Sequence, residues 1–414
     1  MLEGKIIKFY RERKNMTQKE LGDGICSITH VSKIERGLTE VSKETIQFLA
    51  DRLEIDIESE IKTYKGLDTL LKKWEEAIIM KLHAKAETLK QQLEEIALLQ
   101  IPDFYRSHTL LLARFYLMTG DHTKAQSIIQ EMDKWQNPTP LDKNMILHIK
   151  GIYGLQCKHD YLEAIELLKQ IDPAHYHNTE YYYHLAVAYH SINSRVLAYY
   201  YASLALRFFE KAHCYVRVIE TEMLMLIQVG HDTTCGPQDV KYEQLIEMCD
   251  NFGLTKQKAL LLHNYGYHCI LHENFEKACE YYHESMNLKD PSTPEYIGSL
   301  EGFINASVQL GKKSKNELIS LAEKGLKLSK DIDSTTFTHF FQLHYYRLTE
   351  QDERYYDYLE KEMYPYLKKL GYVLPAEHYE IKLFDYHMEK ENIQKANEYA
   401  MLIADKNRRI NHFV

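Results

Sequence analysis

The chain has no long apolar run: no hydrophobic stretch in its 414 residues approaches the roughly 18 residues of a transmembrane helix. Its first residues, MLEGKIIKFYRERKNM, contain neither a long apolar core nor a small-residue cleavage site, so we expect no secretory signal. Together these two absences predict a cytoplasmic protein that does not insert into a membrane.

Paired cysteines are also missing. The seven cysteines are scattered along the chain and form no C-x-x-C pair; they are Cys26, Cys157, Cys214, Cys235, Cys249, Cys269 and Cys279. An odd number without metal-type spacing indicates reduced thiols, several of them buried, rather than a disulfide framework or a zinc site.

The usual catalytic signatures are absent as well. There is no H-E-x-x-H, no glycine-rich phosphate loop and no G-x-S-x-G. His268 and His272 are four residues apart and could share a metal, but the spacing places no third ligand near them. We therefore predict a protein that is not an enzyme and that uses no metal and no cofactor.

Charge is distributed unevenly. The whole chain carries −9, yet residues 1–55 hold ten Lys/Arg and nine Asp/Glu, so the remainder carries −10. Within this front segment we predict that Arg11, Arg13 and Lys14 face phosphates, which supply sequence-independent affinity for DNA. A domain of net charge +1 would bind weakly alone, so we expect two copies on a paired site.

What the front segment does contain is a capped pair of short helices in residues 17–37. Thr17 and Glu20 have the spacing of a capping box, and Gly22-Asp23-Gly24 allows a tight reversal. Ser27 caps a second helix whose Val31 and Ile34 share one buried face, and Gly37 ends it. Ser42 caps a further helix with Ile46, Leu49 and Leu53 inward, and residues 2–14 form a first helix with Leu2, Ile6 and Phe9 or Tyr10 inward.

This arrangement predicts a helix-turn-helix whose second helix enters a DNA major groove. We expect Ile28, Thr29, His30 and Lys33 to meet base edges, and we place Thr17, Gln18 and Ser27 in the same DNA-binding set. A helical hairpin without a DNA role is the alternative. The stretch resembles the Xre/Cro-type helix-turn-helix, whose pattern appears here as Thr17-Gln18, Leu21, Ser27, Val31-Ser32, Ile34-Glu35 and Gly37.

The remainder of the chain shows a repeat of small residues twelve positions apart: Ala113 with Ala125, Ala186 with Ala198, and Gly266 with Ala278. Ile152 with Ala164 and Phe384 with Ala396 keep the spacing but lose the first small residue. A small residue on each of two antiparallel helices lets their backbones approach closely. The pattern resembles the tetratricopeptide (TPR) repeat, of which we count about eight or nine.

We expect helix pairs to start near Leu70, Phe104, Asp142, Thr179, Tyr215, Thr255, Glu295, Thr335 and Ala376. The predicted fold is therefore all-α: a DNA-binding domain over 1–58, a linker over 59–69, and a right-handed TPR superhelix over 70–414. An unrelated all-α bundle is the alternative. Stacked repeats line a concave surface with their first helices, and we expect a ligand there.

Two asparagines, Asn264 and Asn305, lie in first helices among apolar residues. An amide carries a donor and an acceptor and can pair with a peptide backbone in both directions. We predict that both contact a peptide, with Tyr267 and His268 of the same segment beside them. A locally satisfied amide between helices is the alternative, and the two do not occupy equivalent repeat positions.

An Xre-type helix-turn-helix followed by this repeat array resembles the peptide-sensing Rap–Rgg–NprR–PlcR–PrgX (RRNPP) regulators of Gram-positive bacteria, most of all the NprR branch and then PlcR. The resemblance implies quorum sensing. The TPR domain would bind a short imported signalling peptide, change the arrangement of a homodimer or larger homo-oligomer, and so alter binding to double-stranded DNA.

Two other functions stay open. One is a Rap-like module that sequesters a response regulator of the sporulation phosphorelay in the absence of peptide. The other is a peptide-responsive decision regulator of a phage.

Overall fold

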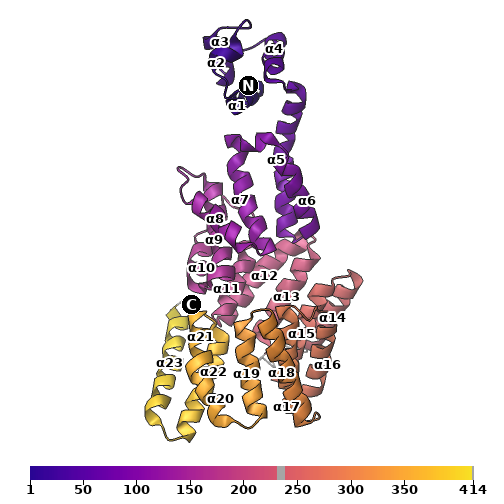
Figure 1. The fold of residues 1–414 in the computed structure, drawn as a ribbon, viewed down its shortest axis with the longest axis vertical. Helices are drawn as coiled ribbons and strands as arrows, with labels where there is room; N and C mark the ends of the chain where they lie inside the picture. The colour runs from indigo at the N-terminus through magenta and orange to yellow at the C-terminus, as the bar shows by residue number, and fades with distance from the viewer. Residues whose placement is uncertain (231–237, 413–414) are drawn as a thin grey trace. The chain divides into compact units, whose positions relative to one another are not determined.

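The computed structural model describes residues 1–230 and 238–412, with side chains up to residue 404, so Cys235 lies outside the described residues. All the regular structure in the described part is helical (Figure 1). The chain divides into two compact units, Met1–Ile149 and Lys150–Val414. No helix among the described residues is both long and apolar enough to cross a bilayer.

The first unit begins with four short helices: α1 Leu2–Arg13, α2 Gln18–Gly22, α3 Ile28–Glu35 and α4 Lys43–Leu53. Longer helices follow: α5 Ile57–Ile79, α6 His83–Glu94, the 3₁₀ turn η1 Ala97–Gln100, α7 Pro102–Thr119 and α8 His122–Met132. Helix α9, Pro140–Tyr153, crosses into the second unit and continues as one π-helical turn, η2 Gly154–Lys158.

The second unit continues with α10 Tyr161–Lys169, α11 Tyr181–Ser191, α12 Arg195–Lys211, α13 Tyr215–Val229, α14 Gln238–Asn251, α15 Thr255–Leu271 and α16 Phe275–Asn287. Its last part comprises α17 Pro294–Leu310, α18 Lys315–Asp331, α19 Thr335–Leu348, α20 Asp352–Tyr358, the π-helical turn η3 Leu359–Met363, α21 Tyr364–Lys369, α22 Val373–Glu389 and α23 Ile393–His412.

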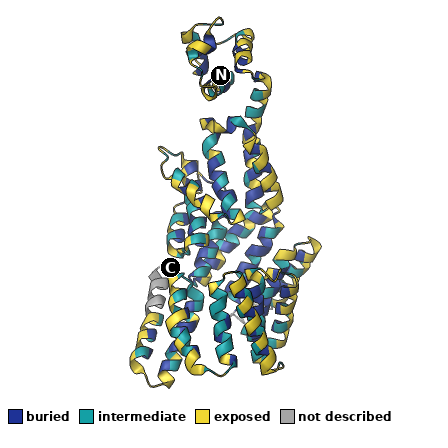
Figure 2. Cartoon of the chain, in the orientation of Figure 1, coloured by how far each residue is buried: buried dark blue, intermediate teal, exposed yellow. Residues whose placement is uncertain are grey.

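Consecutive helices pack as pairs, which confirms the predicted TPR-type architecture. Tyr215, Thr255 and Thr335 are the first residues of α13, α15 and α19, as predicted, and the five other predicted starts from residue 104 onward fall within three residues of a helix start. The small residues at the twelve-residue spacing are buried, since Ala113, Ala125, Ala186, Ala198 and Ala278 have no exposed surface. Figure 2 shows that buried residues gather on the sides where helices pack against one another, and exposed residues on the outer sides.

The predicted start at Leu70 is wrong, because α5 begins at Ile57. The Asp56 carboxylate accepts hydrogen bonds from the amides of Glu58 and Ser59, at 3.1 and 3.3 Å, and so caps the helix. The helix therefore begins well before the start that we predicted for the first repeat. Residues 59–69, which we expected to link the two domains, therefore form part of a continuous helix.

Tyr282 sets the spacing between the first helices of two repeats. A Cβ atom on Gly302 of α17 would lie 2.4 Å from the Tyr282 ring, and one on Gly266 of α15 would lie 3.0 Å from it. The buried ring thus fits between α15 and α17 only because both positions lack a side chain. These two helices carry the asparagines predicted to contact a peptide.

Candidate DNA-binding helix and ligand pocket

The caps that define the helix-turn-helix form as predicted. The Thr17 hydroxyl accepts the amide of Glu20 at 3.2 Å, and the Glu20 carboxylate accepts the amide of Thr17 at 2.7 Å. The Ser27 hydroxyl accepts the amide of His30 at 3.2 Å, which starts α3. Gly24 and Gly37 both have a φ of 69°, so the reversal and the helix end use the left-handed backbone region that glycine favours.

The turn between α2 and α3 is held from α4. Arg52 of α4 donates to the carbonyl oxygens of Leu21 at 3.0 Å and Glu20 at 3.2 Å, and to that of Asp23. These carbonyls belong to the end of α2 and have no partner within that short helix. Sequence reasoning missed this contact because nothing near residue 52 indicates it. The consequence is that α4 holds the C-terminal end of α2 in place.

Helix α3 presents a polar outer face. Val31 and Ile34 are fully buried, whereas Ile28 is 49% exposed and Thr29 and Lys33 are exposed. His30 is half-buried, and Ser27 and Thr17 are exposed at their caps. The first turn and a half of α3 therefore offers hydroxyl, imidazole, ammonium and methyl groups, which are the groups that read base edges.

Arg11 is not the phosphate contact that the sequence predicted. Its guanidinium forms a two-point ion pair with Glu35 of α3, with Nε 2.5 Å from Oε1 and an Nη 3.0 Å from Oε2, and Glu35 raises the pKa of Arg11. Gln18 donates to the same carboxylate at 2.8 Å. Arg11 and Ile7 occupy the inner face of α1 beside Ile6, while Leu2, Phe9 and Tyr10 are only half-buried. Arg11 therefore holds α1 to α3.

The other two predicted phosphate contacts lie at the surface. Arg13 is exposed, and Lys14 pairs with Glu54 at 2.6 Å through exposed side chains. An exposed pair of this kind contributes only about 0–1 kcal/mol and can exchange its partner for a phosphate. Lys19, Arg36 and Lys43 are further exposed cations of this domain that we did not single out from the sequence.

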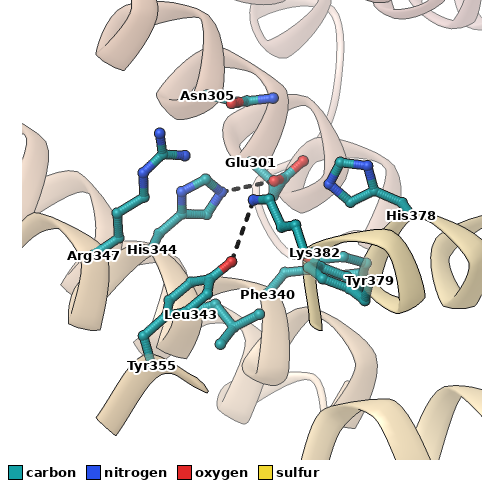
Figure 3. A pocket seen from close by; sticks show the side chains of 10 residues that line it. All are labelled: Glu301, Asn305, Phe340, Leu343, His344, Arg347, Tyr355, His378, Tyr379 and Lys382. Atoms are coloured by element: carbon teal, nitrogen blue, oxygen red, sulfur yellow. Dashed lines mark hydrogen bonds and ion pairs between the residues drawn. The ribbon is translucent and has the colours of Figure 1, made fainter. Parts of the chain in front are cut away.

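In the second unit, a small pocket of about 80 Å³ opens between α17, α19, α20 and α22 (Figure 3). Asn305 and Glu301 lie one turn apart on α17 and face it. The other lining residues are Phe340, Leu343, His344 and Arg347 of α19, Tyr355 of α20, and His378, Tyr379 and Lys382 of α22. The pocket thus combines aromatic and aliphatic side chains with several charged or amide groups, which could fix one small polar group of a ligand.

The charged groups of this pocket are only partly paired with each other. His344 Nε2 lies 2.7 Å from the Glu301 carboxylate, and Lys382 donates to the Tyr355 hydroxyl at 3.4 Å. Partial burial, together with the positive charge of Arg347, lowers the pKa of Lys382. Burial raises the pKa of Tyr355 to about 12, so its hydroxyl stays neutral. Two cations therefore share a site in which the one carboxylate already binds a histidine.

Of the four predicted peptide contacts, Asn305 is the one that lines this pocket. Asn264 is half-buried on α15 and its amide lies 2.9 Å from the sulfur of Met223 on α13. Tyr267 is 50% exposed, one turn from Asn264 on the same side of α15. His268 is 7% exposed and packs against the rings of Tyr242 and Tyr265, so it is part of the core rather than the surface.

The His268–His272 pair does not build a metal site in the part of the chain that the structure describes. The two rings lie with their centroids 4.4 Å apart, but His272 Nε2 is 3.1 Å from the carbonyl oxygen of Gly230. No three His, Cys, Asp or Glu side chains among the described residues are grouped so that they could hold a metal ion.

Residues 7–59 match a family of helix-turn-helix domains. No curated protein matches the chain by sequence. In fold, the chain is similar to a Rap protein complexed with competence and sporulation factor, with a TM-score of 0.70 at 15% identity over 84% of this chain and 99% of that one.

The fold is also similar to two structures of NprR. The apo form of this quorum sensor, from B. thuringiensis, gives a TM-score of 0.63 at 19% identity over 83% of this chain and 99% of that one. The structure of NprR in complex with its cognate peptide NprX gives a TM-score of 0.62 at 17% identity, over 81% of this chain and 98% of that one. At these identities the likeness shows the fold alone, an array of packed helix pairs.

Proposed function

We propose that this chain is a cytoplasmic transcription regulator that binds double-stranded DNA through α3 and a short signalling peptide through its TPR region. The observation that supports it most directly is the combination, in one chain, of a capped α3 with an exposed reading face and a pocket with unpaired polar groups. The solved complex of NprR with its cognate peptide has the same fold. Nothing in this combination requires catalysis, and we infer that the protein acts by binding.

The DNA-binding domain carries too little positive charge to bind tightly as a single copy. We therefore propose that a homodimer or larger homo-oligomer places two α3 helices on paired half-sites. A peptide that rearranges the subunits would change the distance between these helices and hence the affinity for the operator. Arg13 and Lys14, with Lys19, Arg36 and Lys43, would contact phosphates, and Ile28, Thr29, His30 and Lys33 would read bases.

We expect the double substitution His30→Ala/Lys33→Ala to remove sequence-specific DNA binding. Each lost base contact costs about 1–3 kcal/mol, so the specific affinity should fall roughly 100-fold or more while non-specific binding persists. The measurement is selection of duplexes from a random pool by the full chain, followed by anisotropy on the enriched site.

Lys65→Ala, an exposed lysine of α5, is the matched control and should bind the enriched site normally. Thermal melting checks that the double variant stays folded. An unchanged footprint for the folded double variant would show that α3 is not the reading helix.

The peptide half of the proposal is tested by calorimetric titration of short peptides into the full chain. Peptides encoded beside the gene come first, followed by a short random pool. We expect Asn305→Ala to weaken binding about tenfold, since the loss of a backbone-pairing amide costs about 1 kcal/mol or more. Asn287→Ala, an exposed asparagine of α16, is the control. If both variants bind the peptide with equal affinity, Asn305 does not contact the peptide.

A second candidate function is the sequestration of a response regulator, which is the Rap-like alternative. The likeness of the fold to that of a Rap protein supports this alternative. The His30→Ala/Lys33→Ala variant separates the two. A transcription regulator loses its effect in cells with this variant, whereas a sequestering protein keeps it.

A further inference from the structure

The pocket between α17, α19 and α22 is positively charged overall. Among its ten lining residues, Arg347 and Lys382 are cations and Glu301 is the one carboxylate. With the histidines neutral, the lining therefore carries a formal charge of +1. Among the described residues Glu301 forms no ion pair with either cation, and its carboxylate accepts a hydrogen bond from His344 at 2.7 Å.

Neither cation has an anionic partner among the described residues. Arg347 is exposed at the rim and forms no ion pair there. Lys382 is half-buried, and its ammonium group contacts only neutral groups: the Tyr355 hydroxyl at 3.4 Å and the Tyr355 ring, with the centroid 5.8 Å away. Partial burial lowers the pKa of Lys382, and repulsion from Arg347 lowers it further. An anion between the two would remove this repulsion.

A neutral donor lies on the opposite wall. Asn305 is half-buried, faces the pocket, and makes no hydrogen bond with another described residue (Figure 3). Its amide could bind an oxygen of the anion or the peptide group next to it. The remaining wall, Phe340, Leu343 and Tyr379, is apolar or aromatic and suits the carbon atoms that carry the anion.

We propose that this pocket binds a carboxylate of the peptide ligand, with Arg347 and Lys382 pairing with its oxygens and Asn305 donating to it or to the adjoining peptide group. This rests on the proposed peptide-binding function. A planar guanidinium matches a carboxylate with two parallel hydrogen bonds. A net charge of +1 fits a monoanion, and the nearby Glu301 disfavours a phosphate dianion.

The carboxylate has two possible sources, the C-terminus of the peptide or an Asp or Glu side chain. Four random pools of short peptides distinguish them: unmodified, C-terminally amidated, free of Asp and Glu, and both amidated and free of Asp and Glu. Each pool is incubated with the full chain and the retained peptides are read by mass spectrometry. Enrichment lost on amidation identifies the C-terminus, and enrichment lost without Asp and Glu identifies a side chain.

The pool without any carboxylate should show no enrichment. For peptides enriched by the wild-type chain, Arg347→Gln and Lys382→Gln should each weaken binding about tenfold, as expected for the loss of a charge-assisted hydrogen bond. Matched controls are Arg354→Gln on α20 and Lys390→Gln, whose ammonium lies over the Tyr386 ring at 5.9 Å in the same way as Lys382 lies over Tyr355. Both controls should bind like the wild type.

The two proposals fail in different ways. If the wild-type chain enriches peptides equally from all four pools, or if Arg347→Gln and Lys382→Gln leave the affinity unchanged, the carboxylate assignment is wrong while peptide binding stands. If no pool yields any enriched peptide, the peptide-binding function is wrong, and the carboxylate assignment falls with it.

Discussion

Glu35→Gln is expected to abolish operator binding by unfolding the helix-turn-helix domain, not by removing a DNA contact. The Glu35 side chain is 2% exposed and that of Arg11 is 11% exposed, and the carboxylate accepts from Arg11 on both oxygens. Glutamine has nearly the same shape but no charge, and it offers one acceptor oxygen in place of two. The substitution therefore removes the buried counter-charge of the Arg11 guanidinium and leaves it only the exposed Glu12 carboxylate, at 3.3 Å.

The expected cost is large relative to the stability of the domain. Removing one partner of a buried ion pair typically costs about 3–5 kcal/mol. A helical domain spanning α1 to α4 has a total stability of only about 3–8 kcal/mol. The measurement is hydrogen exchange followed by mass spectrometry on the full chain. Amides of α1 to α4 should lose protection, whereas those of α7 and later helices should keep it.

Glu12→Gln is the matched control, because Glu12 contacts the same guanidinium, at 3.3 Å, through a side chain that is 56% exposed. It should change stability by less than about 1 kcal/mol. Arg11→Met/Glu35→Leu, which removes both charges, should restore part of the protection. Normal exchange in Glu35→Gln would show that the pair does not hold α1 to α3.

The Arg11–Glu35 ion pair also shows a limit of prediction from the sequence. The caps at Thr17, Ser27 and Ser42 are interactions over three residues, so they follow from the local sequence, and all three form. Arg11 and Glu35 are 24 residues apart. Nothing in the local pattern distinguishes Arg11, which is buried, from Arg13, which is exposed, because both are arginines in a charged stretch of one helix.

The candidate pocket shows the same limit. The repeat starts could be predicted because small residues at a fixed spacing reflect packing between neighbouring helices. Asn264 and Asn305 have similar local surroundings, yet only Asn305 lines the pocket, whereas Asn264 lies against Met223. Arg347 and Lys382 come from α19 and α22, and no local signal indicates that they face one site. Sequence gives the helices, but tertiary packing selects which polar groups share a pocket.

Arg217→Met is expected to be the most destabilising substitution in the second unit. Arg217 is 1% exposed and donates to Glu180 of the α11 cap and to Glu220 of α13, each at 3.1 Å. Its guanidinium also lies over the rings of Tyr183 and Phe209, at 4.1 and 4.8 Å from their centroids. One side chain thus joins α11, α12 and α13. Methionine fills most of the volume but leaves two buried carboxylates without their cation.

We expect a loss of about 3–5 kcal/mol, because the uncompensated charges outweigh the gain from a more apolar side chain. Urea denaturation of the full chain, followed by hydrogen exchange, measures the size of the loss and locates it to α11–α13. Arg195→Met, which removes an exposed arginine of α12 that donates to Asn193 at 3.3 Å, should change stability little.

Adding Glu180→Gln and Glu220→Gln to Arg217→Met should recover much of the loss, since no buried charge of the network then remains. If the triple variant is no more stable than Arg217→Met, the loss comes from the stacking on Tyr183 and Phe209, not from the carboxylates. Helix α13 also carries Met223, the contact of Asn264. The charge network fixes α13, whereas the residues that line the candidate pocket come from α17, α19, α20 and α22. Where the Arg217→Met variant remains folded, it should therefore keep the affinity of the pocket for a peptide.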